Sequence, residues 1–243
     1  MKTEFFKILT NEKIAKDVYK MTLQGDCQGI ACGQFVNIAI EGLYLRRPIS
    51  VCEVSGDVLT LIYKVVGKGT EAMSYMTHGK LLHLLTGLGN GYDLSQSGQR
   101  PLLIGGGVGV PPMYQLAKEL RALDKEVTVI LGFNKEEEIF YAKEFEALGA
   151  KVYVATVDGS VGEKGFVTDV MKKLPDYTYV YTCGPEPMLK AVYNESKTSG
   201  QFSFEERMGC GFGACMGCSC KTKYGNKRIC KEGPVLTKEE IIW

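Results

Sequence analysis

Near the carboxyl end the sequence reads FEERMGCGFGACMGCSCKTKYGNKRICKEGPVL (204–236), which holds five of the chain's nine cysteines. Cys210, Cys215 and Cys218 are spaced C-x4-C-x2-C, and Cys230 follows after a further eleven residues. An odd number of cysteines, gathered at one end, is a poor framework for disulfides. In a protein without export signals such a cluster indicates metal or redox chemistry.

The C-x4-C-x2-C spacing is the plant-type spacing for four thiolates that hold a [2Fe–2S] cluster. Glycines relax the loop so that its backbone N–H groups can face the sulfurs; they are Gly209, Gly211, Gly213 and Gly217. The predicted metal ligands are Cys210, Cys215, Cys218 and Cys230. A structural zinc site and unligated thiols remain as alternatives, although zinc usually recruits a second closely spaced pair. Cys220 is a possible competitor of Cys218.

Composition excludes several other classes of protein. The 243 residues are 45% hydrophobic and 23% charged, which argues against a disordered or coiled-coil chain. With 29 Lys and Arg against 28 Asp and Glu, the net charge of +1 predicts no general attraction to nucleic acid or to a membrane. No run reaches the roughly 18 apolar residues that span a bilayer. We therefore expect a soluble, cytoplasmic protein.

The first hundred residues are typical of short β-strands. Turn residues separate runs that are rich in β-branched and aromatic side chains; they are Val18–Gly25, Gly33–Ile40, Ile49–Val54 and Val58–Val66. Many short strands without a long helical pattern predict a small antiparallel barrel. One short helix is expected near Thr70–Met76.

From Pro101 to about Lys197, strand-like runs alternate with helical periodicity, as in Met113, Leu116 and Leu120. Four such units predict a parallel sheet covered by helices. The last forty residues are rich in Cys and Gly and could bury little core unaided. We expect three units: an antiparallel barrel (1–98), a nucleotide-binding α/β domain (99–200) and a cluster-binding subdomain (201–243).

A [2Fe–2S] cluster moves one electron at a time, so hydride exchange with a pyridine nucleotide requires a two-electron converter, normally a flavin. The segment Arg46-Arg47-Pro48-Ile49-Ser50 begins a barrel strand. An Arg there can donate two N–H bonds to a pyrophosphate, and Ser50 offers a hydroxyl to the flavin ring. The short helix after Thr70 would direct N–H groups at phosphate. A basic strand start on a solvated edge is the alternative.

Two turns predict a dinucleotide site. Ile104-Gly105-Gly106-Gly107-Val108-Gly109-Val110-Pro111-Pro112 and Cys183-Gly184-Pro185-Glu186-Pro187-Met188 each join a strand to a helix. In a parallel sheet both turns fall at the carboxyl ends of the strands, where ligands bind. The predicted contacts are Gly105, Gly106, Gly107, Gly109, Cys183, Gly184 and Pro185. Three acidic residues after Lys135 favour NAD over NADP, and Lys135 is the residue that could overturn this preference.

In the order R-P-x-S, G-G-G-x-G-x-P-P, C-G-P-x-P-M, these motifs resemble the ferredoxin–NADP reductase superfamily. With ERMGCGFGACMGCSCKT and RICKEGPVL added, the chain resembles the electron-transfer subunits of class B (NAD-dependent) dihydroorotate dehydrogenases. The resemblance implies FAD contacts at Arg47, Pro48, Ile49, Ser50, Ile62, Tyr63, Lys64, Gly69 and Thr70. The turn Thr86–Tyr92 resembles a glycine-rich turn of the family but lacks its Pro, so no ligand is assigned to it.

The resemblance also implies a function. Such a subunit carries FAD and a [2Fe–2S] cluster and pairs with an FMN-containing catalytic subunit, in a two-plus-two heterotetramer. Electrons from dihydroorotate would pass through the cluster and FAD to NAD⁺, in pyrimidine (UMP) biosynthesis. No general base is convincing, so no catalytic residue is predicted. The alternatives are another NAD(P)H:ferredoxin oxidoreductase subunit, a hydrogenase diaphorase subunit, or a zinc-stapled flavoprotein scaffold without enzymatic activity.

Overall fold

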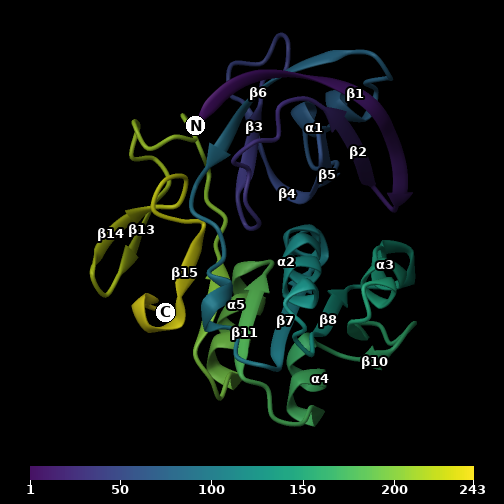
Figure 1. Ribbon diagram of the computed structural model, residues 1–243, viewed down its shortest axis with the longest axis vertical. Coiled ribbons are helices and arrows are strands. Elements are labelled where there is room, and N and C mark those ends of the chain that lie inside the picture. Colours follow the sequence, from purple (N-terminus) through teal and green to yellow (C-terminus); the bar gives the residue numbers. More distant parts are fainter.

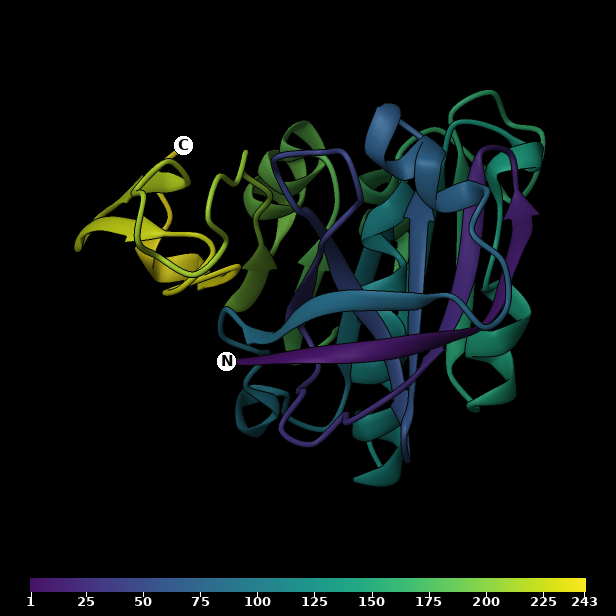
Figure 2. The ribbon, with the colours of Figure 1, turned by 90° about the horizontal axis from the view of Figure 1, so that it is seen from above.

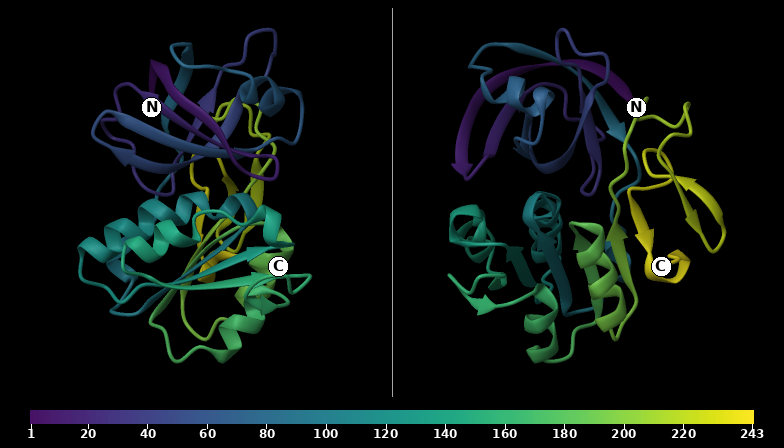
Figure 3. Two further views of the ribbon diagram at one scale, coloured as in Figure 1. Left: turned by 90° about the vertical axis from the view of Figure 1, so that its right-hand side faces the viewer. Right: turned by 180° about the vertical axis from the view of Figure 1, so that it is seen from behind.

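The computed structural model describes all 243 residues, which form a barrel, a parallel-sheet domain and a carboxyl-terminal tail (Figure 1). The barrel and the parallel sheet lie one above the other, and the tail passes along one side of both (Figure 3). The predicted combination of an antiparallel barrel with a parallel sheet is confirmed.

The barrel is closed in the strand order β1-β2-β5-β4-β3-β6. Its strands are β1 (Lys2–Ala15), β2 (Val18–Gln24), β3 (Phe35–Ile38), β4 (Arg47–Ser55), β5 (Val58–Lys64) and β6 (Leu81–Leu88). The four predicted runs correspond to β2–β5, whereas β1 and β6 were not predicted. In β1, Phe6 and Ile8 are buried while the flanking Phe5 and Lys7 are exposed, so this strand has the alternation of a half-buried strand.

The helix α1 (Lys68–Ser74) follows β5. The short helix expected near Thr70–Met76 is therefore present, but it begins two residues before Thr70 instead of after it. The Thr70 hydroxyl instead accepts hydrogen bonds from the backbone N–H groups of Val66 (3.0 Å) and Gly67 (3.3 Å). Thr70 therefore holds the turn that leads into the helix.

The second sheet has the strand order β10-β9-β8-β7-β11-β12-β15. Its strands are β7 (Pro101–Gly106), β8 (Thr128–Phe133), β9 (Lys151–Thr156), β10 (Glu163–Lys164), β11 (Tyr179–Cys183), β12 (Gly200–Ser203) and β15 (Val235–Thr237). All neighbours pair in parallel except β12 and β15. The helices are α2 (Pro111–Ala122), α3 (Ala142–Ala147), α4 (Val167–Lys173) and α5 (Glu186–Glu195), and the short 3-10 turns are η1 (Leu94–Gln96), η2 (Gly107–Gly109), η3 (Glu136–Glu138) and η4 (Lys238–Glu240).

The tail is tied to the parallel sheet by β12 and β15, which pair with one another. Between them, β13 (Ser219–Thr222) and β14 (Gly225–Arg228) form a hairpin that projects to one side (Figure 2). Phe202 and Leu236 of the tail are buried in a core cluster that also contains Ile104 and Val180 of the sheet. The tail therefore gains its core from the domain against which it packs.

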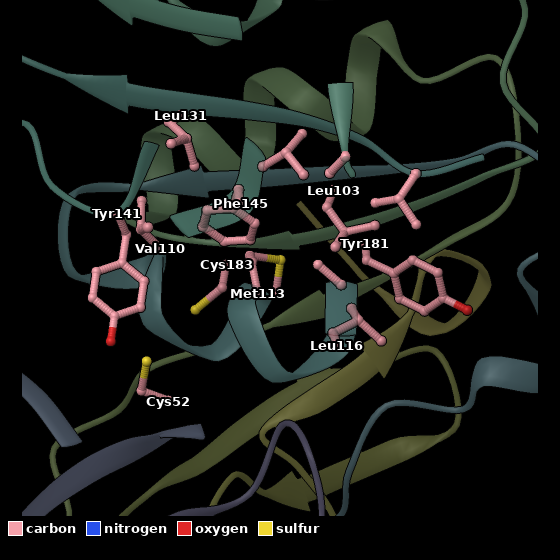
Figure 4. Close-up of a cluster of buried hydrophobic side chains, with 14 of the residues drawn as sticks. Cys52, Leu103, Val110, Met113, Leu116, Leu131, Tyr141, Phe145, Tyr181 and Cys183 are labelled. Carbon is pink, nitrogen blue, oxygen red and sulfur yellow. The ribbon is translucent and has the colours of Figure 1, made fainter. Parts of the chain in front are cut away.

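A hydrophobic core also joins the barrel to the parallel-sheet domain (Figure 4). Cys52 of β4 faces Tyr141, close to Val110 and Met113 at the start of α2 (Figure 4). Two polar contacts add to this interface: Lys118 forms a 2.6 Å ion pair with Glu53, and the backbone N–H of Val54 donates to Gln115. The barrel and the parallel-sheet domain are therefore packed against each other.

None of the helices has the length and apolar character needed to cross a bilayer.

Candidate functional site

One loop and one hairpin bring the four predicted cluster ligands into two pairs. Cys210, Cys215 and Cys218 lie in the coil that precedes β13. The β13–β14 hairpin returns the chain so that Ser219 faces Arg228, and the backbone N–H of Ile229 donates to the carbonyl of Cys218 (3.0 Å). Cys230 therefore lies beside Cys218, although eleven residues separate them.

Backbone N–H groups point at the sulfurs of this loop. The N–H groups of Ala214 and Cys215 donate to the Cys210 sulfur at 3.3 and 3.4 Å, and the N–H of Cys230 donates to the Cys218 sulfur at 3.4 Å. Burial raises the pKa of the Cys210 thiol, but hydrogen bonds from the N–H groups of Phe212, Cys215 and Ala214 outweigh burial and lower it to about 6. The loop thus stabilises a thiolate at Cys210.

The contacts divide the four cysteines into two pairs, Cys210 with Cys215 and Cys218 with Cys230. No three Cys, His, Asp or Glu side chains in the chain converge on one ion-sized site. A dinuclear cluster held by four thiolates takes two at each iron. The donor set, its pairing and its inward-facing N–H groups fit a [2Fe–2S] cluster.

The remaining cysteines lie outside these pairs. Cys220 is half-buried in β13, and burial raises its pKa. Cys27, Cys32 and Cys52 are buried in the core of the barrel or beneath α2. Burial raises the pKa of Cys27 to about 11 and that of Cys52 to about 12, so both thiols stay protonated at neutral pH.

A cavity of about 310 Å³, here called the barrel cavity, lies at the predicted flavin segment. Every predicted FAD contact except Gly69 lines it. From the barrel it is lined by Phe35, Arg47, Pro48, Ile49, Ser50, Ile62, Tyr63, Lys64, Val66 and Thr70. The Tyr63 hydroxyl is already bound to Asn11 (2.9 Å), so its side chain is fixed in the barrel.

The two adjacent arginines have different surroundings. Arg46 donates to the carbonyls of Asn37 (3.2 Å) and His83 (3.1 Å), and its guanidinium lies 2.9 Å from the His83 Nδ1. Arg47 lines the barrel cavity and bonds only to carbonyls of its own turn, Leu45 and Arg46. A Cβ on Gly69 would lie 1.9 Å from the Arg47 Nε. Gly69 therefore provides the space for the Arg47 side chain, and Arg47 is the arginine that is free to meet a ligand.

The tail supplies a wall of the barrel cavity that the sequence analysis missed. Its residues are Ser203, Phe204, Glu205, Glu206, Met208 and Pro234. One feature could have indicated this wall: Ser203 ends a strand that lies parallel to β11, and ligands bind at the carboxyl ends of such strands. Met208 and Pro234 lie two and four residues from Cys210 and Cys230. The barrel cavity therefore lies next to the coil that carries Cys210, Cys215 and Cys218, here called the cysteine loop.

A second cavity, of about 670 Å³, lies at the carboxyl ends of the parallel strands and is here called the sheet cavity. Gly106, Gly107, Gly109, Gly184 and Pro185 line it, as predicted for a nucleotide site. On its far side it is lined by Phe133, Asn134, Glu138, Val157, Phe166 and Thr168. Its backbone-lined turns and apolar side walls suit a dinucleotide.

The other two predicted nucleotide contacts, Gly105 and Cys183, do not line the sheet cavity. A Cβ on Gly105 would lie 2.8 Å from the Cα of Val110, and a Cβ on Gly109 would lie 2.2 Å from the carbonyl oxygen of Cys183. The Cys183 side chain points into the core (Figure 4), where burial raises its pKa to about 12. These residues allow the two turns to pack against each other.

The two cavities adjoin. Lys64, Val108 and Glu205 line both of them. Protein atoms around the Glu205 carboxylate remove water from it and raise its pKa, although the residue remains exposed to solvent. A ligand in one cavity would therefore lie next to a ligand in the other, with these three residues beside both.

The acidic loop after β8 is tied to the barrel. Glu137 pairs with Lys16 and with Lys135, both at 2.8 Å, and Glu138 pairs with Lys64 at 3.5 Å. Lys135 does not line the sheet cavity, whereas Glu138 does. The cation that could have favoured a 2′-phosphate is therefore directed to a neighbouring carboxylate, and Glu138, which the loop places at the cavity, is paired with Lys64.

The turn at 86–92, to which no ligand was assigned, contacts the tail. The side-chain amide of Asn90 donates to the carbonyl of Val235 (2.7 Å) and accepts from its N–H (3.0 Å). The backbone N–H of Asn90 donates to the carbonyl of Gly233. This turn therefore fixes the segment that runs from Cys230 to the barrel cavity.

Two sequence families match the chain. Residues 205–242 match the family described as the iron–sulfur cluster binding domain of dihydroorotate dehydrogenase B. Residues 103–194 match the family described as an oxidoreductase NAD-binding domain. The first match contains all four paired cysteines, and the second contains both turns of the sheet cavity.

Relatives match along the whole chain. A protein of Fusobacterium nucleatum subsp. nucleatum, named dihydroorotate dehydrogenase B (NAD(+)), electron transfer subunit, is 44% identical over 259 residues, with 99% of each chain covered. A Bacillus pumilus protein of the same name is 41% identical over 255 residues, covering 99% of this chain and 98% of its own.

Solved structures share the fold. A chain of an NADH-dependent reduced ferredoxin–NADP oxidoreductase, studied for flavin-based electron bifurcation, superposes with a TM-score of 0.90 at 28% identity, covering 98% of this chain and 90% of its own. A ferredoxin NADP⁺ reductase from Neisseria gonorrhoeae, with bound FAD and NADP, has a TM-score of 0.68 at 18% identity, covering 80% and 90%.

Proposed function

Because the chain belongs to the family of electron transfer subunits of dihydroorotate dehydrogenase B, we propose that it relays electrons from a catalytic partner subunit to NAD⁺. It is the electron-transfer component of an oxidoreductase that serves pyrimidine biosynthesis. One observation carries the proposal: the barrel cavity shares one wall with the sheet cavity, and its other wall contains Met208 and Pro234, which flank the cluster cysteines in the sequence.

The chain's residues fit three redox groups. When bound, the [2Fe–2S] cluster exchanges single electrons, and FAD collects two and exchanges a hydride with NAD⁺. Cys210, Cys215, Cys218 and Cys230 would hold the cluster. The barrel cavity would hold FAD, with Arg47 on its pyrophosphate and Ser50 on its ring. The glycine turns of the sheet cavity would hold NAD, and the loop around Glu138 disfavours a 2′-phosphate.

The partner we propose is an FMN-containing catalytic subunit, in a two-plus-two heterotetramer. Supporting this, the cysteine loop and the hairpin expose apolar side chains, namely Phe212, Met216 and Tyr224. Cys215 is also exposed. Exposed apolar groups beside a redox centre suit contact with a second protein. We place the complex in the cytoplasm, since none of the nine cysteines forms a disulfide.

The test is co-purification with the catalytic subunit from the same genome. We expect equal amounts of both chains in one peak, with a mass of two copies of each. Met216→Asn should weaken the complex, and Leu123→Asn is a matched control, because both side chains are 55% exposed and Leu123 lies at the end of α2. Asn tolerates the positive φ of Met216. Two chains that elute separately would contradict the proposed partner.

A second measurement addresses the nucleotide. Under anaerobic conditions, NADH should reduce the bound flavin of the isolated chain faster than NADPH does at equal concentration. The reason is that the two lysines of this region are already paired, Lys135 with Glu137 and Lys64 with Glu138, so neither is free to bind a 2′-phosphate. Faster reduction by NADPH would contradict the preference for NAD.

A further inference from the structure

The Gly213–Ala214 peptide group in the cysteine loop is hydrogen-bonded through both its N–H and its carbonyl. Its N–H, from Ala214, donates to the Cys210 sulfur at 3.3 Å. Its carbonyl, from Gly213, accepts from the Nη1 of Arg228 at 2.7 Å. A trans peptide group is planar and its N–H and C=O point in opposite directions. The guanidinium therefore lies on the side of this peptide away from the sulfur.

Arg228 is held firmly in this position. Its Nε and its backbone N–H both donate to one carboxylate oxygen of Glu232 at 2.9 Å, and its Nη2 pairs with the other oxygen. Its backbone carbonyl accepts from the N–H groups of Lys231 (2.9 Å) and Glu232 (2.8 Å). A forked Arg–carboxylate pair of this kind fixes the plane of the guanidinium as well as its position.

The peptide needs such a constraint. Gly213 has a φ of +93°, and glycine turns its flanking peptides more easily than any other residue. A rotation of the peptide would replace the N–H at the Cys210 sulfur with a carbonyl oxygen. A hydrogen bond from a cation to the carbonyl also polarises the peptide and strengthens the bond that its N–H makes at the other end.

We propose that Arg228 is a positioning residue that holds the Gly213–Ala214 peptide with its N–H on the Cys210 sulfur and thereby raises the reduction potential of the iron–sulfur cluster. Hydrogen bonds to the sulfurs and nearby charge both tune such potentials. The inference rests on the proposed function, since it requires that the four cysteines hold a cluster. Glu232 takes part by orienting the guanidinium.

Two other roles of Arg228 must be distinguished from positioning of the peptide: a purely structural link within the tail, and an effect of its positive charge alone. A substitution at Lys231 tests the effect of charge alone. Its aliphatic stem would lie 2.6 Å from a Cβ on Gly213, so it is as near to the loop as Arg228, but it is exposed and donates no side-chain hydrogen bond. Lys231→Gln therefore removes the same unit charge beside the loop without removing the bond to the Gly213 carbonyl.

The experiment is an EPR-monitored redox titration of the full chain, purified anaerobically with FAD and cluster, for wild type, Arg228→Gln, Arg228→Lys and Lys231→Gln. Arg228→Gln should lower the equilibrium constant for cluster reduction up to tenfold, which is about 59 mV for one electron. Lys231→Gln should shift it less than twofold. Arg228→Lys, which keeps the charge but lacks the fork, should lie between wild type and Arg228→Gln.

The proposal also predicts a spectroscopic change. In deuterated buffer, pulsed EPR of the reduced cluster should detect a deuteron at the Ala214 amide in wild type and lose its coupling in Arg228→Gln. A wild-type potential in Arg228→Gln, or equal shifts in Arg228→Gln and Lys231→Gln, would overturn the proposal. If Arg228→Gln does not load iron, a wild-type potential in Arg228→Lys would overturn it. A wild-type chain without any cluster would instead refute the proposed function.

Discussion

Gly69→Ala should separate the binding of FAD from the stability of the fold. The added Cβ would lie 1.9 Å from the Nε and 2.6 Å from the Cζ of Arg47, whereas ordinary contacts between such atoms are about 3.5–4.0 Å. The guanidinium must therefore move by about 1.5–2 Å. Gly69 lies in α1 without a positive φ, so the backbone itself accepts alanine.

The magnitude follows from what Arg47 is proposed to do. Losing its charge-assisted hydrogen bonds to a pyrophosphate costs about 1.5–3 kcal/mol of binding free energy. This corresponds to a dissociation constant for FAD that is about 10- to 150-fold larger. Alanine in place of a helical glycine stabilises the helix by up to about 1 kcal/mol. We therefore expect weaker FAD binding in a protein whose thermal unfolding temperature is unchanged or higher.

The assay is a fluorescence titration of FAD into the flavin-free chain. Arg47→Ala should weaken binding by a similar factor, and the double variant should show little further loss, because both changes act through one side chain. Arg46→Ala is the control: its guanidinium bonds to Asn37 and His83, so it should lower stability instead. Wild-type affinity in Gly69→Ala, or fully additive losses in the double variant, would refute the reasoning.

Three further predictions concern other parts of the site. Cys215→Ala should abolish the iron–sulfur absorption bands but leave the FAD content unchanged; bands that persist would show that Cys215 is not a ligand. Asn90→Ala removes the three side-chain hydrogen bonds to the Glu232–Val235 segment, so it should lower the free energy of unfolding by roughly 2–4 kcal/mol in denaturant titrations. An unchanged midpoint would exclude that role. Because desolvation raises the folded-state pKa of Glu205 above its unfolded value, its ionisation opposes folding as the pH rises. Glu205→Gln should therefore be more stable than wild type at pH 8, and the difference should vanish as the pH falls below the ordinary carboxyl pKa of 4.5; the reverse trend in thermal unfolding would contradict this sign.

The parts of the site that sequence predicted best are those that depend on local spacing. Cys210, Cys215 and Cys218 lie within one loop, so their approach to one another requires no knowledge of the fold. The same holds for Arg47 and Ser50, which line the barrel cavity three positions apart on one strand. The R-P-x-S motif at the start of the strand was enough to place both.

The parts that sequence missed depend on how distant segments meet. The wall formed by Ser203–Met208 and Pro234 exists because β12 pairs with both β11 and β15, a strand order that no local pattern reveals. The strand β1 was missed because Phe6 and Ile8, which are buried, are flanked by the apolar Phe5 and Leu9, so the sequence shows no alternation of apolar and polar residues. Its register against β2 shifts twice, so one regular period does not run through its length.

The division of work between Arg46 and Arg47 also required the structure. The two residues are chemically identical and adjacent, and only the contacts of Arg46 with β3 and β6 show which one is already committed. Similarly, Gly105 and Cys183 belong to motifs typical of nucleotide sites, yet they serve close packing of the two turns. A motif therefore predicts the location of a ligand site more accurately than it predicts which residues of the motif contact the ligand.

The most direct test of the account is an EPR spectrum of the anaerobically purified chain after addition of NADH. The account predicts a reddish-brown protein that gives a rhombic signal of a reduced [2Fe–2S] cluster, with an intensity approaching about one spin per chain. Electrons would then have travelled from the nucleotide to the four cysteines. A preparation that contains zinc, is at most yellow and gives no such signal with NADH or dithionite would contradict it.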